Sequence, residues 1–210
     1  MTPEVVVRSA TTRAPVPLVE EIGLLTASPA LELWELWQQT GRDDPPFWAY
    51  PWAGGQALAR HLLDNPETVR GRRVLDVASG SGLVAIAAAR AGAASVVAGD
   101  IDPHAVAAIA INAAANGVEI GARAFDLAAD SAGDAELVLA GDVFYQRELA
   151  ELALRFLRVA ADAGADVLVA DPGRAFVPTD SLTALDRYQV PVLTAIEDAP
   201  VKSVTVYRLT

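Results

Sequence analysis

The sequence contains no cysteine, two histidines and a single lysine, and each shortage excludes a class of site. Without cysteine the chain forms no disulfide and has no thiolate nucleophile or thiolate metal ligand. His61 and His104 are too few for a histidine-rich metal centre, so we expect no metal, and we expect both rings to be exposed. Lys202 is the only lysine and no Gly-Lys-Ser/Thr sequence exists, which excludes a P-loop.

Basic residues and long apolar runs are also scarce. Lys and Arg number 16 against 27 Asp and Glu, a formal net charge of -11, whereas binding to nucleic-acid phosphates requires clustered basic residues. This charge instead attracts a basic protein surface or a cationic substrate. No uncharged apolar run is long enough to cross a membrane, and residues 1–4 lack the basic start of a signal peptide. We therefore expect a cytoplasmic protein that binds neither nucleic acid nor a membrane.

The composition predicts one main domain preceded by an extension. A length of 210 residues with 52% hydrophobic residues is ample for a single core. Residues 1–45 are interrupted by proline and form the predicted extension, with an edge strand over residues 5–7, a helical turn over 20–25 and a short amphipathic helix that begins after Ser28 and Pro29. Residues 46–210 form the predicted main domain.

The pattern over residues 74–100 predicts a strand, a tight loop, a helix and a second strand. Val74, Leu75 and Val77 form a buried strand, residues 78–82 are only Ala, Ser and Gly, and residues 83–90 read as an apolar helix. Such a loop lets a ligand touch the backbone and presents it to a helix N-terminus. The second strand ends on Asp100, about 20 residues past the glycines, the spacing at which a carboxylate meets a ribose in a nucleotide-binding unit.

Asp76 restricts the class of ligand that this unit can bind. Residues 80–85 satisfy G-x-G-x-x-A, so a nicotinamide cofactor is one alternative. However, the carboxylate of Asp76 precedes the loop, where it would repel a pyrophosphate but could face an amino-acid ammonium. A ligand with that ammonium at one end and an adenosine ribose at the other is S-adenosylmethionine.

These segments resemble the first two cofactor motifs of class I methyltransferases, with D-V-A-S-G-S-G at 76–82 and G-D-I-D-P at 99–103. The family usually has glycine where this chain has Ala78, and alanine is tolerable there if the backbone φ is not positive. Asp126 follows a predicted strand, and the resemblance implies that it accepts a hydrogen bond from the adenine amino group. The implied cofactor is S-adenosylmethionine, and the residues expected to bind it are Trp52, Asp76, Ser79, Gly80, Ser81, Gly82, Asp100, Ile101 and Asp126.

An aromatic group at residues 47–52 precedes two glycines and a helix. Large aromatic side chains mostly bury surface, so this group could be a lid on the core. Alternatively, Trp52 forms one wall of the cofactor pocket. The two interpretations are compatible.

The remaining pattern completes an α/β fold. Asp102 is the expected N-cap of a helix over 103–115, and Asp142 ends the fourth strand. A short helix is expected over 181–188, followed by strands over 189–196 and 201–209 whose short connection requires an antiparallel pair. The prediction is a Rossmann-like doubly wound sheet of seven strands, mostly parallel with a C-terminal antiparallel hairpin. Further strands are expected over 119–125, 137–142 and 166–170, and a further helix over 147–161.

Five further motifs follow one another along the chain, namely W-A-G-G-Q-A-L at 52–58, L-L-D-N-P at 62–66, D-I-D-P at 100–103, G-D-V-F-Y at 141–145 and D-P-G-R at 171–174. Through these motifs residues 46–174 resemble a narrower branch, the electron-transfer-flavoprotein β-subunit lysine methyltransferases and their bacterial relatives. The resemblance implies methyl transfer to a lysine ε-amine of a protein substrate, with Asp142 and Tyr145 at the substrate mouth. Ala53 and the pair Gln146 and Arg147 depart from the branch near that mouth.

The expected chemistry assigns positioning roles to these two residues. A lysine amine with a pKa of about 10.4 must lose its proton before it can react. Asp142 favours ammonium binding and can orient the amine, so we assign it positioning and not general-base catalysis, while Tyr145 supplies an acceptor or an aromatic wall. The alternatives are a nicotinamide-like small-molecule amine as acceptor, a non-catalytic adaptor, and an NAD-dependent oxidoreductase, for which a Tyr-x-x-x-Lys pair and a catalytic cysteine are missing.

Overall fold

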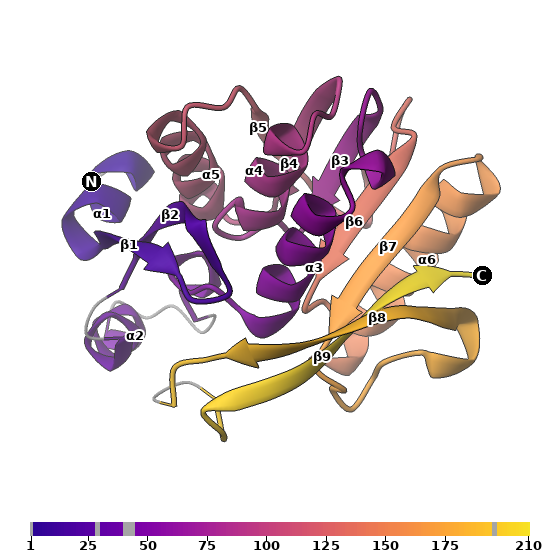
Figure 1. Ribbon diagram of the computed structural model, residues 1–210. Helices are drawn as coiled ribbons and strands as arrows, with labels where there is room; N and C mark the ends of the chain where they lie inside the picture. The colour runs from indigo at the N-terminus through magenta and orange to yellow at the C-terminus, as the bar shows by residue number, and fades with distance from the viewer. Residues whose placement is uncertain (1, 28–29, 40–44, 195–196) are drawn as a thin grey trace.

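The computed structural model describes residues 2–27, 30–39, 45–194 and 197–210, and a seven-stranded sheet forms its centre (Figure 1). The strands are β3 (Arg73–Val77), β4 (Ser95–Asp100), β5 (Gly121–Ala124), β6 (Leu137–Gly141), β7 (Asp166–Asp171), β8 (Leu182–Pro191) and β9 (Val201–Leu209). Their order across the sheet is β5-β4-β3-β6-β7-β9-β8. The five strands from β5 to β7 are parallel, and β9 pairs antiparallel with both β7 and β8. The predicted sheet and its C-terminal hairpin are confirmed.

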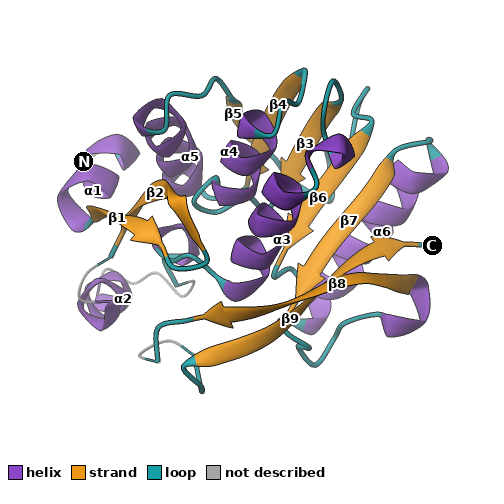
Figure 2. Cartoon of the chain, viewed as in Figure 1, coloured by secondary structure: helices purple, strands orange, loops and turns teal. Residues whose placement is uncertain are grey.

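Helices cover both faces of this sheet, as Figure 2 shows. One face carries α3 (Ala53–Asp64), α4 (Leu83–Arg90) and α5 (Pro103–Ala115), and the other carries α6 (Arg147–Asp162). Three short 3-10 helices lie in connections, namely η1 (Phe47–Ala49), η2 (Pro66–Thr68) and η3 (Thr179–Ser181). Within the described ranges, no helix is long and apolar enough to cross a membrane.

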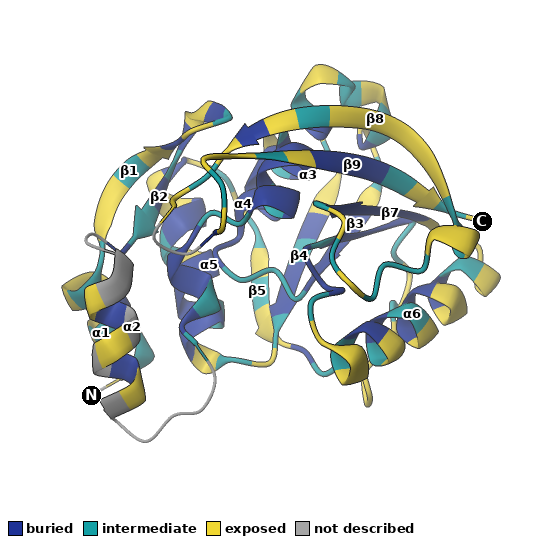
Figure 3. Ribbon diagram, turned by 90° about the horizontal axis from the view of Figure 1, so that it is seen from below, coloured by how far each residue is buried: buried dark blue, intermediate teal, exposed yellow. Residues whose placement is uncertain are grey.

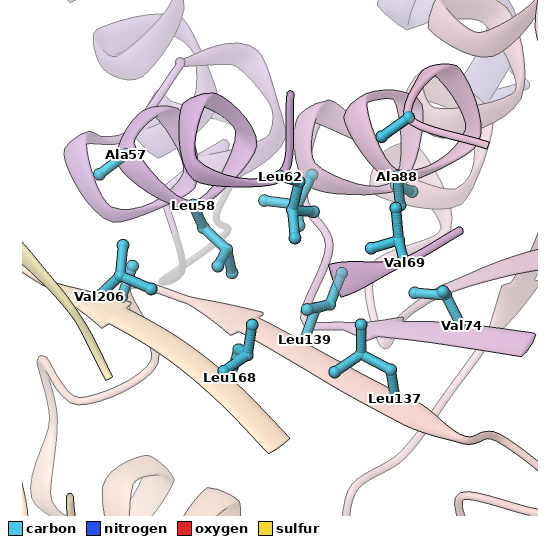
Figure 4. Packing of buried hydrophobic residues seen from close by; sticks show 14 of the residues in the cluster. Ala57, Leu58, Leu62, Val69, Val74, Ala88, Leu137, Leu139, Leu168 and Val206 are labelled. Atoms are coloured by element: carbon cyan, nitrogen blue, oxygen red, sulfur yellow. The ribbon is translucent and has the colours of Figure 1, made fainter. Parts of the chain in front are cut away.

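The strand residues explain this layering. Successive side chains of a strand point to opposite faces, so a run buried on both faces is continuously apolar. In β6, Leu137 and Leu139 pack with Leu58 and Leu62 of α3 (Figure 4), whereas Val138 belongs to the cluster on the α6 side. Both cores therefore depend on the same short strand.

The helix α5 begins as predicted, but its first turn is not exposed. Asp102 accepts a hydrogen bond from His104 N at 2.9 Å and Pro103 occupies the first position. The ring of His104 lies 5.0 Å from that of Trp37 and is only 6% exposed, because the N-terminal segment packs over this turn. His61 is 7% exposed, because β8 crosses its helix and places Tyr188 against it. The expectation that both histidines are exposed is wrong.

The N-terminal segment contains a helix and a hairpin that differ from the sequence prediction. Its elements are α1 (Pro3–Ala10), β1 (Thr12–Val16), β2 (Val19–Thr26) and α2 (Ala30–Gln39). The edge strand expected at residues 5–7 is part of α1, because a proline opens the helix and packing buries Val7. The helical turn expected at 20–25 is strand β2, since Ile22 and Leu24 are buried against α4 and β1 supplies the ladder. The expected helix α2 is confirmed, whereas Ser28 and Pro29 lie outside the described residues.

The C-terminal segment also corrects one prediction. Residues 182–188, expected in a short helix, belong to β8, which pairs with β9 from Leu182 to Pro191 with one irregularity between Ala184 and Asp186. Figure 3 shows β8 largely exposed while the central strands are buried. Because most of β8 is exposed, its sequence has little apolar periodicity to separate strand from helix. Pairing with β9 decided its conformation.

Two glycines let α3 approach the ends of β6 and β7 closely. A Cβ atom on Gly54 would lie 2.5 Å from Ala170 O and 2.6 Å from Asp142 Oδ2. A Cβ atom on Gly141 would lie 2.9 Å from Gly55 N. These positions require glycine because the backbones themselves are in contact.

We predict opposite effects for alanine at the two neighbouring helix positions. Gly54→Ala should lower the free energy of unfolding by about 1–3 kcal/mol, since the new methyl group overlaps backbone atoms. Gly55→Ala, whose Cβ would meet only Leu83 Cδ2 at 4.0 Å, should raise it by about 1 kcal/mol through helix propensity. Urea unfolding of the two variants measures both values. Equal effects would contradict the close approach.

Candidate active site

A cavity of about 230 Å³ lies at the carboxyl ends of β3 and β6. It is lined by seven of the site residues predicted from the sequence, namely Trp52, Asp76, Ser79, Gly80, Ser81, Asp142 and Tyr145. The other lining residues are Phe47, Tyr50, Gly55, Ala78, Leu83, Val84, Gly141, Val143, Leu149 and Arg174. The cavity therefore joins the glycine loop to the expected substrate mouth.

Asp100 holds the glycine loop in place. Its Oδ2 accepts a hydrogen bond from Gly80 N at 2.9 Å, and its Oδ1 accepts one from Asp102 N at 3.0 Å. Burial raises the pKa of Asp100, and the backbone donors oppose this effect. The loop itself adopts left-handed φ values of 56° at Gly80 and 84° at Gly82. Asp100 thus organises the loop whether or not it also binds a ribose.

Asp76 is a buried carboxylate at the end of β3. Its Oδ2 accepts hydrogen bonds from Ser79 Oγ at 2.5 Å and Ala85 N at 3.2 Å, and the residue is 1% exposed. Burial raises the pKa of Asp76 to about 7, although both hydrogen bonds lower it. Among the described residues no basic side chain bonds to it. A cationic ligand group beside Asp76 would therefore be stabilised.

Two residues next to this cavity carry backbone strain. Ala78 has φ 49° and Asp142 has φ 57°, and they follow the adjacent parallel strands β3 and β6. The left-handed region costs an L-residue about 1–2 kcal/mol. The condition under which alanine at position 78 was expected to be tolerable is therefore not met, because this position does have a positive φ. Such strain persists where the surrounding structure imposes it, commonly at functional sites.

Four predicted cofactor residues lie outside the cavity lining. Gly82 caps α4 at the start of the helix, and Asp100 borders the loop. Ile101 is 73% exposed just beyond β4. Asp126 lies beyond β5, where its Oδ1 accepts from Ala128 N at 2.8 Å. The ends of β4 and β5 are joined by the bond from Phe125 N to Asp100 O at 3.0 Å, so these residues share one edge of the site.

Aromatic rings line part of the same cavity. Trp52 donates from Nε1 to Phe47 O at 2.9 Å, and its ring centroid lies 5.7 Å from that of Phe47 and 5.9 Å from that of Tyr50. The ring of Tyr145 lies 5.3 Å from that of Phe47. Burial raises the pKa of Tyr50 to about 12, so this hydroxyl stays protonated. Trp52 is therefore both a packing residue and a pocket wall.

The carboxylate of Asp142, which directly follows strand β6, caps the N-terminus of α3. Its Oδ2 accepts a hydrogen bond from Gly54 N, and Trp52 at the N-cap position makes no side-chain cap of its own. Orphan N–H groups and the helix dipole both favour a carboxylate at that point. Burial raises the pKa of Asp142, whereas Arg174 and the Gly54 N–H lower it. The side chain is thus fixed by structural contacts at the mouth of the cavity.

Two residues that sequence reasoning did not assign form an ion-pair network with Asp142. Arg174 Nη2 donates to Asp142 Oδ1 at 2.9 Å and to Glu197 Oε1 at 3.0 Å. Arg174 belongs to the D-P-G-R motif, which contributed to the resemblance but gave this residue no role. Glu197 carried no local signal, because it lies in the connection between β8 and β9 and reaches the site only through folding. Phe47 and Tyr50 belong to the aromatic group already visible in the sequence.

Comparison with known proteins identifies methyltransferases. A family model of ribosomal protein L11 methyltransferase (PrmA) matches residues 57–160. An electron transfer flavoprotein beta subunit lysine methyltransferase from Xenopus laevis is 44% identical over 165 residues, which are 76% of this chain and 65% of that protein. The protein of the same name from Danio rerio is 38% identical over 197 residues, covering 91% of this chain and 76% of its own length. The chain thus spans less than two thirds of the Xenopus relative.

Solved structures share the fold. A magnesium protoporphyrin IX methyltransferase from Synechocystis with bound SAH gives a TM-score of 0.53 at 16% identity, covering 74% of this chain and 82% of that one. At such low identity the likeness bears on architecture alone. It agrees with the seven-stranded sheet described above.

We predict that Ala78→Gly stabilises the chain. Glycine removes the cost of the left-handed backbone, about 1–2 kcal/mol. It also raises the entropy of the unfolded chain, which lowers stability by about 0.4–1 kcal/mol. The net gain in unfolding free energy should be about 1 kcal/mol in urea titration. Ala163→Gly is the control. Ala163 has a φ of -79°, which alanine adopts without strain, so this variant should be less stable than the original chain. Destabilisation by Ala78→Gly would show that the loop is not strained.

Proposed function

Because this chain belongs to the electron transfer flavoprotein β-subunit lysine methyltransferase family, we propose that it transfers methyl groups from S-adenosylmethionine to lysine ε-amines of a protein substrate. The observation that carries the proposal is the single cavity that contains both the glycine loop and the Asp142 and Tyr145 side chains. Methyl transfer is an in-line displacement, so donor and acceptor must share one enclosed space. A nicotinamide-dependent oxidoreductase loses its support, since this family consists of methyltransferases.

The residues at the loop end fit S-adenosylmethionine, which when bound supplies an electrophilic methyl group. Asp76 offers a buried carboxylate for the amino-acid ammonium, and Ser79, Gly80 and Ser81 of the loop line the same cavity. The exposed Ile101 suits an apolar contact with the adenine, with Asp100 and Asp126 on the same edge. We assign these residues to cofactor binding on this fit.

At the other end, the chain's residues can hold an amine. Asp142 and Tyr145 face the cavity together with Phe47 and Trp52, and aromatic faces favour cationic or methylated nitrogen. The acceptor amine first releases a proton to solvent. With S-adenosylmethionine bound, the lone pair of this amine would accept the methyl group, and the electron pair of the broken C–S bond would remain on sulfur. Asp142 and Tyr145 orient the nitrogen for this attack.

The charge of the chain supports a protein substrate with a basic surface. At -11, the net charge attracts lysine-bearing surfaces over long range. At the site itself Asp142, Glu197 and Asp198 are paired with Arg174 or Lys202, so this preference rests on the net charge of the chain. The expectations of a cytoplasmic location and of no nucleic-acid partner stay predictions.

We predict that cofactor binding depends on the ionisation of Asp76. Its pKa of about 7 should fall when an ammonium approaches, so binding near neutral pH releases a proton. The affinity for S-adenosylmethionine should therefore rise with pH up to about 7 and then level off. Calorimetric titration in buffers of different ionisation enthalpy measures the released proton. In Asp76→Asn the dependence should disappear, and an unchanged pH dependence there would remove Asp76 from this role.

We predict that the acceptor is a protein lysine. The experiment mixes this chain and labelled S-adenosylmethionine with either the electron transfer flavoprotein β-subunit or nicotinamide. The labelled methyl group should appear only on the protein. Mass spectrometry of peptides should place the added mass on lysine. Transfer to nicotinamide alone would show a small-molecule enzyme, and absence of transfer to both with cofactor bound would indicate a non-catalytic adaptor for these acceptors.

We predict that Asp142→Ala lowers kcat at least about a hundredfold, since a misplaced acceptor costs that much. S-adenosylmethionine affinity, measured by calorimetry, should change by less than about threefold, since the loop end of the cavity is intact. Asp162→Ala, an exposed aspartate at the end of α6, serves as the matched control and should retain full turnover. Unchanged turnover in Asp142→Ala would place the acceptor elsewhere.

A further inference from the structure

Arg174 is the only basic residue among the described residues that line the cavity. Its Nε and Nη2 atoms donate to the same oxygen, Asp142 Oδ1, at 3.0 and 2.9 Å. Nη2 also donates to Glu197 Oε1 at 3.0 Å, and Cζ lies 5.9 Å from the centroid of the Trp52 ring. Asp142 is 8% exposed and Glu197 9%. The guanidinium is therefore held between two buried carboxylates at the acceptor end.

The backbone of Arg174 is fixed as firmly as its guanidinium. Directly after β7, Asp171 Oδ1 accepts hydrogen bonds from Gly173 N at 2.7 Å and Arg174 N at 2.6 Å. Gly173 has a φ of 89°, which completes the turn. With both ends of the side chain restrained, little rotamer entropy opposes the ion pair. The D-P-G-R motif thus delivers a preorganised cation to the cavity.

The charges around Arg174 alternate in sign. Beyond Asp142 and Arg174, Glu197 Oε2 lies 3.6 Å from Lys202 Nζ. The charged and titratable groups that face this position from all adjoining elements are Asp142, Asp171, Glu197, Asp198, Lys202, Tyr145, Tyr50 and, across the cavity, Asp76. Arg174 is thus shared by Asp142 and Glu197, and Lys202 is shared by Glu197 and Asp198.

This pairing changes what Asp142 does to an incoming amine. An unpaired buried carboxylate would hold a lysine as ammonium, which has no lone pair to attack a methyl group. Building on the function proposed above, we infer that Arg174 is a positioning residue that cancels the charge of Asp142, so that the site selects the uncharged amine. Asp142 retains lone pairs that can orient this amine through a hydrogen bond. The proton of the lysine leaves to solvent, and no base in the cavity is required.

Glu197 should act in the opposite direction. It adds a negative charge on the outer side of Arg174 and draws the guanidinium partly away from Asp142. Without Glu197 the mouth is more positive, and an ammonium is further disfavoured. Removing the cation and removing the outer anion should therefore shift the protonation of bound substrate in opposite senses. A purely structural role would give both variants the same sign.

The test compares pH profiles of kcat for Arg174→Gln and Glu197→Gln with the electron transfer flavoprotein β-subunit as substrate. The kcat profile reports groups in the enzyme–substrate complex. In Arg174→Gln the acid limb of the kcat profile should move to higher pH by about one unit. This shift lowers kcat about tenfold at a pH on that limb. KM at low pH should fall in the same variant, because Asp142 then binds the ammonium form. In Glu197→Gln the limb should move down.

Arg158→Gln, an arginine on α6 that bonds to Ser181 Oγ, is the surface control and should keep the wild-type profile. Arg174→Lys restores the charge without the paired N–H donors and should recover most of the limb position. The inference is overturned if the acid limbs of both variants coincide with that of the wild type, or if both move in the same direction. The proposed function stands in either case. If Arg174→Gln does not fold, the sign of the Glu197→Gln shift decides alone. Absence of transfer by the wild-type chain overturns the proposed function and this inference with it.

Discussion

The contact between the N-terminus of α3 and the end of β6 is the constraint on which the site depends. Gly54 and Gly141 bring the two backbones together, and the Asp142 carboxylate accepts the Gly54 N–H. This one carboxylate therefore caps a helix, pairs with Arg174 and lines the cavity. Stability and cavity geometry are coupled there, since a side chain that serves the fold keeps its place in the cavity lining.

Backbone strain accompanies this arrangement. Ala78 and Asp142 adopt left-handed conformations where the neighbouring strands β3 and β6 meet the cavity. The strain at Asp142 is offset by three hydrogen bonds to its side chain, from Gly54 N and from two nitrogens of Arg174. Ala78 makes no comparable contribution from its methyl group. The loop after β3 consequently contains a local conflict that packing of the surrounding sheet and helices overrides.

Much of the sheet could be predicted because its strands are short apolar runs with clear boundaries. Residues 74–77, 137–140 and 167–171 are buried, and these runs are apolar apart from Asp76 and Asp171, so hydrophobicity identifies them without knowledge of their neighbours. The prediction failed at residues 5–7, 20–25 and 181–188, which are partly or largely exposed. In these segments partners from elsewhere in the chain decide between helix and strand, and local pattern carries little information.

The sequence alone determined the strand–loop–helix unit, the acids at positions 76, 100 and 142, and the aromatic group before α3. Each is a local pattern whose physical meaning depends on residues close together in the chain. Only the tertiary structure decided that Arg174 neutralises Asp142, that Glu197 holds the other side of Arg174, and that His104 lies under Trp37. These contacts join residues from different elements, and because burial and ion pairing depend on distance in space, no local pattern specifies them.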